Sequence, residues 1–252
     1  MNQYSFSSEV NQKIVDGILN GYNEYIQVRA DKKRTMNISG AYAWTKGNHI
    51  DDAVSKELLD LNITFNSAKA GYTWGYLQFN HNDGEGNRMF MIKNAKYFNV
   101  KEFDRSKTPL GEKTSSKRTN YILELSKANS AIQFKEHAET SSQEQLTLVV
   151  DLGFHHLEES NDVAQELSKA FNEFHIITYS TDEANQINEI KQYMPNPIDK
   201  KAYLVNDLSA YIGTSQVETD MVDYSIVDSE SEELMYDAQD FGIGLPAMEE
   251  EE

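Results

Sequence analysis

Apolar residues recur every three or four positions along the first part of the chain, beginning after Ser7 and Ser8. This spacing predicts a helix with one buried face, and serine is favoured at the position just before a helix starts. The polar run 31–34 breaks the pattern, so we interpret it as a loop that follows the helix. The residues of the apolar stripe are Val10, Ile14, Ile18, Tyr22, Tyr25 and Ile26.

A second helix and then several strands are predicted between residues 48 and 93. Asn48 suits a helix start, and four apolar positions follow it on one face. Aromatic and alternating residues favour strands from residue 63 onward, and the run 81–87 is typical of a turn. We therefore expect an antiparallel hairpin or meander over 63–93. The apolar positions of the second helix are Ile50, Val54, Leu58 and Leu61.

The central part of the chain carries weaker signals. Residues 99–120 form a polar, basic connection, and a connection of that length is typical of a functional loop or of an unordered segment. Residues 121–137 fit a helix better than a strand followed by a turn. Residues 138–145 read as a linker.

A β-α-β-β unit is predicted after the linker. The apolar run 146–152 indicates a buried strand, and 157–171 indicates an amphipathic helix. Residues 174–179 and 187–194 favour two further strands, and 203–212 favours a last short helix.

The order of these elements predicts an α+β fold, with a mixed α/β fold as the alternative. We expect an N-terminal helix and antiparallel-hairpin subdomain over 1–137 and a β-α-β-β subdomain over 146–213. An acidic and flexible tail would follow over 214–252.

Composition narrows the class of protein. The chain has 252 residues and no cysteine, which excludes a disulfide scaffold, a thiolate nucleophile and a zinc site built on cysteine. No apolar run approaches the roughly 18–20 residues needed to cross a bilayer. The first residues also lack the basic and apolar regions of a signal peptide. We therefore expect a cytoplasmic protein.

Charge is concentrated at one end of the chain. The formal net charge is −18, and 13 of the 41 acidic residues lie between Glu218 and Glu252, where there is no lysine or arginine. Residues 1–217 therefore carry only −5 of that charge. Overall acidity disfavours unaided binding to duplex nucleic acid, because phosphates repel it.

The tail is the first candidate functional segment. Carboxylates interleaved with apolar residues can imitate phosphates while burying apolar anchors in a cationic groove. This favours a protein partner with a basic surface; the alternative is a solubilising tail without a target. The candidate partner-binding residues are Asp228, Glu230, Glu232, Glu233, Tyr236, Asp237, Asp240 and Phe241.

A basic segment over 93–118 is the second candidate. It carries a local net charge opposite to that of the tail, so it suits nucleic acid, or the tail of the same or another copy. Tyr97, Phe98 and Phe103 would be available to stack on single-stranded bases. The alternative is a solvated loop. Its candidate residues are Lys93, Lys96, Lys101, Arg105, Lys107, Lys117 and Arg118.

A metal-dependent nuclease or other hydrolase is the alternative function. Such enzymes place a carboxylate two residues before a lysine on a strand, so that the carboxylate holds Mg²⁺ while the lysine positions water. Glu189 and Lys191 fit this spacing, with Asp182 or Asp151 upstream. A second match fails, because Met91 stands two residues before Lys93, where the carboxylate should be, although Glu57 lies on the preceding helix.

A histidine pair is a further candidate for a metal site. His155 and His156 lie near Glu158 and Glu159, but adjacent residues on a strand point to opposite faces. We therefore expect no metal site and no cofactor.

Three segments resemble an uncharacterised family of Gram-positive bacterial and phage proteins of unknown function: GYTWGYLQF, FMIKNAKYF and HIITYSTDEANQINEIKQYMPNP. The resemblance covers residues 8–212 and leaves out the tail. It implies a cytosolic protein of phage or mobile-element origin, and it transfers no activity and no site residues.

Together these features predict a non-enzymatic acidic interaction protein, an inhibitor that engages a basic, nucleic-acid-binding partner through its tail. Direct nucleic-acid binding is the less favoured mode, and no membrane partner is expected. A self-assembling protein, in which the basic segment meets a neighbour's tail, is a further alternative. The oligomeric state stays open.

Overall fold

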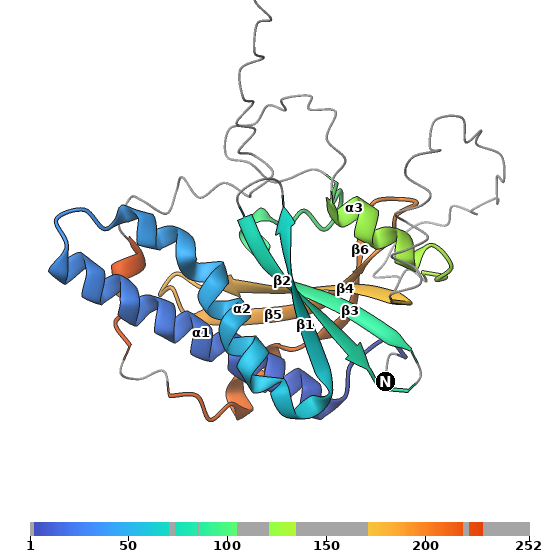
Figure 1. Cartoon of the computed structure of the whole chain (residues 1–252), viewed down its shortest axis with the longest axis horizontal. Helices are drawn as coiled ribbons and strands as arrows, with labels where there is room; N and C mark the ends of the chain where they lie inside the picture. The colour runs from blue at the N-terminus through green and yellow to red at the C-terminus, as the bar shows by residue number, and fades with distance from the viewer. Residues whose placement is uncertain are drawn as a thin grey trace, which may run out of the picture.

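A six-stranded mixed sheet with helices on both faces forms the body of the protein (Figure 1). The computed structural model describes residues 3–70, 74–84, 86–104, 121–134, 171–218 and 222–228. Helices together with this sheet confirm the predicted α+β class. None of the helices in the described ranges is both long and apolar enough to cross a membrane.

The first helix, α1 (Ser8–Thr35), begins where the sequence predicts. The Ser7 hydroxyl accepts a hydrogen bond from the backbone N–H of Val10 at 3.2 Å. The expected loop at 31–34 is wrong, because α1 continues through it. Asp31 pairs with Arg34 one turn later, at 3.0 Å. Basic side chains in the last turn also stabilise a helix, because they interact with the negative end of its dipole.

Two glycines allow α1 to lie against α2 (Lys46–Glu57), which follows the short 3-10 helix η1 (Gly40–Thr45). A Cβ atom at Gly17 would lie 2.6 Å from the Val54 Cα atom, and one at Gly21 would lie 2.5 Å from the His49 carbonyl oxygen. Only a residue without a side chain fits such close backbone approach.

The strands follow one another across the sheet in chain order. Neighbouring strands are antiparallel except for β3 and β4, which are parallel. The antiparallel strands predicted over 63–93 are therefore confirmed, and they share one sheet with the later strands. The strands are β1 (Ile63–Ala70), β2 (Trp74–Asn82), β3 (Asn87–Asn94), β4 (Glu173–Thr181), β5 (Ile187–Pro195) and β6 (Ala202–Asp207).

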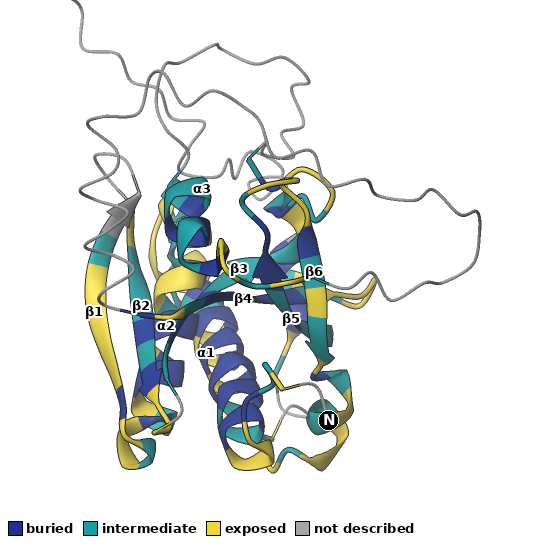
Figure 2. Ribbon diagram, turned by 90° about the vertical axis from the view of Figure 1, so that its right-hand side faces the viewer, coloured by how far each residue is buried: buried dark blue, intermediate teal, exposed yellow. Residues whose placement is uncertain are grey.

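Each face of the sheet carries its own apolar core. On one face, β-strand residues such as Phe90 and Ile177 pack with the stripe of α1 and with α2. On the other, Met91 and Ile176 pack with α3 (Tyr121–Ser126) and with Phe98 and Phe103. We call these the helix face and the α3 face. The central strands are mostly buried, whereas much of the edge strand β1 is exposed (Figure 2).

The later part of the chain departs from the prediction in one place. The helix expected over 203–212 is wrong: its first half is β6, and only Ser209–Thr214 is helical, as the 3-10 helix η5. Burial along this segment has no clear period, because Ala202 and Leu208 are buried while Leu204 between them is 47% exposed, so the pattern does not separate a strand from a helix in so short a run. The predicted strand 146–152 and most of the predicted helix 157–171 lie outside the described residues.

Candidate functional site

A row of polar side chains crosses four strands on the α3 face. The strand register aligns Lys93 of β3 with Thr178 of β4, Thr178 with Lys191 of β5, and Lys191 with Asp207 of β6. Directly paired residues point to the same face of a sheet. Lys93 and Thr178 lie near the carboxyl ends of β3 and β4, which are parallel to each other. The sheet thus brings together Lys93 and Lys191, two lysines that the sequence assigned to different candidate sites.

Tyrosine side chains surround the first of these lysines. The Lys93 ammonium donates a hydrogen bond to the Tyr121 hydroxyl at 2.9 Å and lies 5.3 Å from the centre of that ring. The rings of Tyr121 and Tyr76 are 5.4 Å apart, and Gln78 donates to the Tyr76 hydroxyl at 2.9 Å. We call Tyr76, Gln78, Lys93 and Tyr121 the lysine–tyrosine cluster.

The cluster is half-buried at the edge of the α3-face core. Burial raises the pKa of Tyr76 to about 12, against the smaller lowering effect of the Gln78 hydrogen bond. The Tyr76 phenol therefore stays protonated at neutral pH. The cluster presents one cation, neutral hydroxyl groups and two aromatic rings, and this set suits binding rather than proton abstraction.

Glu189 and Lys191 bind each other. The Lys191 ammonium is 2.5 Å from the Glu189 carboxylate, and the side chains are 22% and 41% exposed. The pKa of Lys191 is raised, chiefly by the hydrogen bond to Glu189. Asp182, the described candidate carboxylate upstream, instead holds the turn between β4 and β5, where it accepts from the amides of Ala184 and Gln186 at 2.9 Å. Asp151 lies outside the described residues.

No nuclease-like metal cluster forms around either lysine within the described ranges. Met91 is buried in the α3-face core at 2% exposure. Glu57 lies on the helix face, where its carboxylate pairs with Lys13 at 3.0 Å. More generally, the described part of the chain holds no group of three or more His, Asp and Glu residues able to bind a metal ion. His155, His156, Glu158 and Glu159 lie outside it.

Only the start of the predicted basic segment is described. Lys96 and Lys101 are exposed, and Lys96 lies 5.9 Å from the centre of the Tyr97 ring. The expected stacking role of Phe98 and Phe103 is wrong, because both are buried in the α3-face core at 2% and 3% exposure. The remaining candidates Arg105, Lys107, Lys117 and Arg118 lie outside the described residues.

The beginning of the acidic region lies along α1. The Ser215 hydroxyl donates to Asp16 at 2.6 Å, and Asn23 donates to the Glu218 carbonyl oxygen at 3.1 Å. Tyr224, in the 3-10 helix η6 (Tyr224–Asp228), donates its hydroxyl proton to Asn23 at 2.7 Å and stacks on Tyr22. This part of the predicted flexible tail is therefore packed against the protein's own body.

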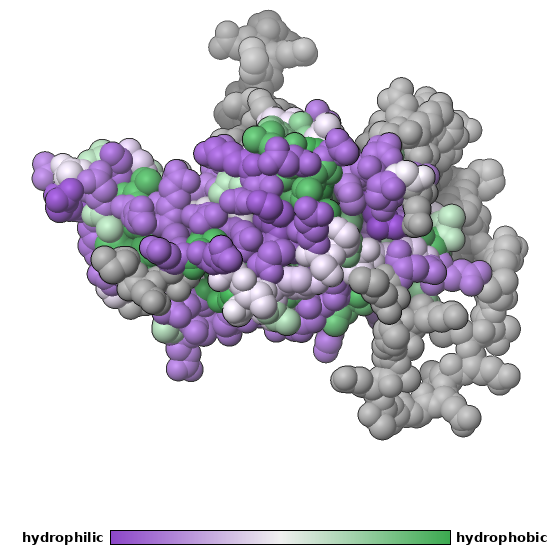
Figure 3. Space-filling view, turned by 90° about the horizontal axis from the view of Figure 1, so that it is seen from below, coloured by the Kyte–Doolittle hydropathy of each residue, from purple (hydrophilic) through white to green (hydrophobic). Residues whose placement is uncertain are grey.

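The carboxylate of Asp223 remains at the surface of this packed segment. It is exposed, and hydrogen bonds from Ser225 lower its pKa, so it is charged at neutral pH. A groove of about 370 Å³ lies between α1 and this segment, lined by Ile26, Val222 and Asp223 among others. Figure 3 shows one face of the molecule, which is mostly hydrophilic and carries hydrophobic residues only in small areas.

Asp228 is the last described residue of the tail. The other candidate partner-binding residues lie outside the described ranges: Glu230, Glu232, Glu233, Tyr236, Asp237, Asp240 and Phe241.

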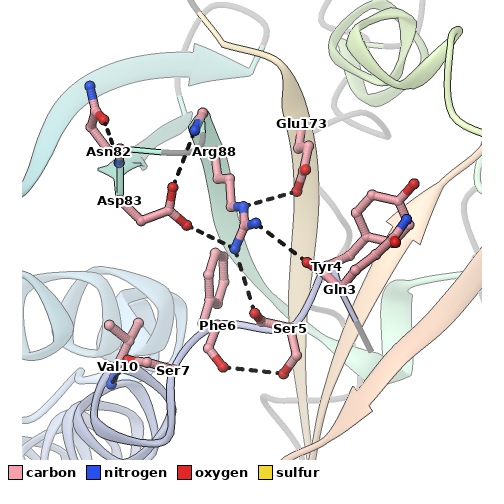
Figure 4. A network of polar contacts seen from close by, with 12 residues as sticks. Gln3, Tyr4, Ser5, Phe6, Ser7, Val10, Asn82, Asp83, Arg88 and Glu173 are labelled. Atoms are coloured by element: carbon pink, nitrogen blue, oxygen red, sulfur yellow. Dashed lines mark hydrogen bonds and ion pairs between the residues drawn. The ribbon is translucent and has the colours of Figure 1, made fainter. Parts of the chain in front are cut away.

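A second polar network lies on the helix face, beneath the N-terminal segment (Figure 4). Arg88 is 6% exposed and pairs with Asp83 at 3.0 Å and Glu173 at 3.2 Å. It also lies within hydrogen-bonding distance of the carbonyl oxygens of Gln3 and Ser5, at 3.4 and 3.5 Å. These contacts hold the N-terminal segment, at Gln3 and Ser5, against the sheet.

His175 extends this network into the core. It is completely buried, 3.0 Å from Glu173 on one ring nitrogen and 3.1 Å from Gln192 on the other. Burial lowers the pKa of His175 despite the opposing effect of Glu173. Phe6 packs on the His175 ring at 5.2 Å. This site is filled by the chain itself.

Sequence reasoning missed the buried charges of the helix face. Asp51 of α2 accepts a hydrogen bond from the Leu77 amide at 2.9 Å, and burial raises its pKa to about 7. Its position beside Ile50 and three residues before Val54 was a signal, because a carboxylate flanking an apolar stripe is a candidate for burial. Nothing comparable marked Arg88, whose partners lie far away in the chain.

Comparisons of the chain with protein-family models, with curated proteins and with solved structures found no match.

Proposed function

We propose that this chain is a non-enzymatic interaction protein of phage or mobile-element origin, an inhibitor whose acidic C-terminal residues engage a basic, nucleic-acid-binding partner. The observation that supports the proposal is the attachment of residues 215–218 and 222–228 to α1. Apolar side chains hold this segment, with Tyr224 and Val227 at 8% and 6% exposure. The carboxylate of Asp223 meanwhile stays exposed.

Attachment by apolar side chains together with an exposed carboxylate suits an acidic binding segment. The apolar residues of the segment supply the attachment to α1. The exposed carboxylate of Asp223 therefore keeps its negative charge at the surface. The nine acidic residues that follow Asp228 in the sequence would then be presented from a fixed starting point. The negative field of these residues attracts a cationic surface, and their carboxylates compete with phosphates for it.

The test compares three forms of the protein as bait in the native host's lysate. One is the full chain, and the second ends at Asp228, which keeps the attachment to α1. In the third, the nine carboxylates after Asp228 are changed to their amides, so that length and apolar residues are retained. We expect the full chain to capture a basic partner that added DNA releases, and both variants to lose it.

Capture of the same partner by the form that ends at Asp228 would contradict the proposal. The alternative activity is checked on the same preparation by incubation with DNA and RNA in Mg²⁺ or Mn²⁺. Cleavage that Glu189→Ala abolishes would replace the inhibitor proposal with a nuclease. Salt-dependent oligomers detected by light scattering of the full chain alone would favour self-assembly.

A further inference from the structure

We propose that the lysine–tyrosine cluster and the neighbouring Lys191 form a binding site for single-stranded nucleic acid. This site lies in the folded body and is separate from the acidic tail, so it goes beyond the function proposed above. Its elements are a cation beside aromatic rings, a second cation on the same face of the sheet, and a location at the carboxyl ends of two parallel strands.

The first argument is the pairing of charge with aromatic surface. Proteins that bind single strands combine cations that contact phosphates with aromatic rings on which bases stack. Lys93 meets this requirement within one cluster, because its ammonium lies 2.9 Å from the Tyr121 hydroxyl and the Tyr76 ring lies 5.4 Å from the Tyr121 ring. Gln78 adds an amide that can bond to a base edge.

The second argument is the position of the other cations. Lys96 and Tyr97 form another cation–aromatic pair at 5.9 Å, just beyond the end of β3. Lys191 lies two strands from Lys93, and strands are about 4.8 Å apart, so the two lysine backbones are roughly 10 Å apart. Neighbouring phosphates along one strand are separated by several ångströms, so a single strand can contact both lysines.

The third argument is the location in the sheet. β3 and β4 form the parallel pair among the described strands, and the row Lys93–Thr178–Lys191 lies near their carboxyl ends. In open sheets with helices on both faces, ligands commonly bind outside the carboxyl ends of the parallel strands. α3 lies over this face of the sheet (Figure 1), and its first residue, Tyr121, bonds to Lys93.

Two carboxylates flank Lys191 and shape the ligand of the site: Glu189 binds it, and Asp207 is paired with it across β5 and β6. Glu189 binds Lys191 at 2.5 Å, so a phosphate must compete with this carboxylate at that position. Lys93 lies 5.3 Å from the centre of the Tyr121 ring and donates a hydrogen bond to the Tyr121 hydroxyl. We therefore assign the main phosphate contact to Lys93 and the stacking to Tyr121 and Tyr76. A rigid duplex offers no unstacked base to these rings, so single strands are preferred.

The experiment measures fluorescence anisotropy of a labelled oligothymidylate of about 12 nucleotides with the full chain, over a series of salt concentrations. Removing one phosphate contact lowers the slope of log K against log salt by about 0.7 for single strands. We expect this loss for Lys93→Gln and a smaller one for Lys191→Gln. Lys13→Gln, which removes one charge on the opposite face, is the matched control and should leave the slope unchanged.

Two tyrosine variants separate stacking from hydrogen bonding. Tyr121→Leu removes the ring and should weaken binding by about five-fold to a hundred-fold. Tyr121→Phe keeps the ring and should change affinity by less than about three-fold. Thermal unfolding of each variant shows whether the half-buried site is intact. Lys191→Gln breaks only a partly exposed ion pair, so it tests the site at little cost to folding.

Three results would overturn the inference: no binding of the oligonucleotide at low salt, equal effects of Lys13→Gln and Lys93→Gln, or equal affinity for duplex and single strand. Unchanged affinity in a folded Tyr121→Leu variant would refute the stacking. The form that ends at Asp228 retains every residue of this site, so failure here is distinguishable from failure of the tail proposal.

Discussion

The two faces of the sheet treat charge in opposite ways. On the helix face, Arg88, His175 and Asp51 are buried and bonded to the chain itself. On the α3 face, Lys93 and Lys191 remain half-exposed at the end of the sheet. A buried charge is costly unless it is paired, whereas a half-exposed one costs little and keeps contact with solvent. The comparison teaches that buried polar networks in this protein stabilise the fold, while the two half-exposed lysines suit ligand binding.

The largest expected effect is on the helix face, at Arg88. Arg88→Met leaves Asp83 and Glu173 without their cation, and removing one partner of a buried pair costs about 3 to 5 kcal/mol. We expect chemical denaturation to show a loss of that size. Arg34→Met is the matched control, because the Arg34 side chain is 79% exposed, and it should change the free energy of unfolding by less than about 0.5 kcal/mol. Equal effects would remove the distinction between buried and exposed pairs.

The second prediction concerns pH and Asp51. Burial raises the folded-state pKa of Asp51 from 3.8 to about 7, so the folded state holds this proton more tightly than the unfolded state does. The contribution of Asp51 to stability is therefore highest at low pH, falls as pH rises from about 4 to 7, and is level above that. Asp51→Asn should remove this loss and stabilise the protein at pH 8 by about 2 to 4 kcal/mol.

Asp52→Asn is the control for that experiment, because the neighbouring Asp52 side chain is 57% exposed. Its stability should follow the wild-type pH profile. His175 acts in the opposite direction: its pKa is lowered, so its contribution is lost as pH falls below 6.5. A wild-type profile that Asp51→Asn leaves unchanged between pH 4 and 8 would show that Asp51 is not buried as a carboxylate.

A third prediction sharpens the description of the helix face. Gly17→Ala would place a Cβ atom 2.6 Å from the Val54 backbone, which forces α1 and α2 apart and should cost about 1 to 3 kcal/mol. Gly47→Ala, where no atom lies within 4 Å, should instead be neutral or stabilising by about 0.5 kcal/mol. Thermal unfolding of the two variants checks this contrast, and a tolerated Gly17→Ala would mean that the helices are packed more loosely.

The smallest effect is expected on the α3 face. Lys191→Gln breaks a partly exposed ion pair with Glu189, and such pairs contribute about 0 to 1 kcal/mol. We expect a change in the free energy of unfolding within that range, measured by urea denaturation. A loss comparable with that of Arg88→Met would mean that Lys191 is a structural residue, and the two faces would not differ.

Much of the fold was predictable because its signals are local. The stripe from Val10 to Ile26 and the alternation after residue 63 each reflect the period of one element. The end of α1 was misplaced, because a pair such as Asp31 and Arg34 stabilises a helix that the hydrophobic pattern alone does not extend. The helix predicted over 203–212 was wrong, because the structure of so short a segment is determined by pairing with β5 rather than by its own apolar spacing.

The candidate site was predictable only in pieces. The sequence singled out Lys93 and Lys191 separately, as parts of a basic segment and of a hydrolase motif. Their alignment depends on the register of β3, β4 and β5 across a long stretch of intervening chain. The burial of Phe98 and Phe103 could not be foreseen for the same reason, since both pack against strands that come later in the sequence.

Mass-spectrometric measurement of lysine modification rates, with and without the oligothymidylate, tests the contrast between the faces most directly. Lys46 on the helix side is 8% exposed and lies over the Tyr22 and Tyr25 rings, so it should react slowly under both conditions. Lys93 and Lys191 should react faster and become protected when the oligonucleotide is added. Equal reactivity of Lys46 and Lys93, with no protection of either, would contradict the account.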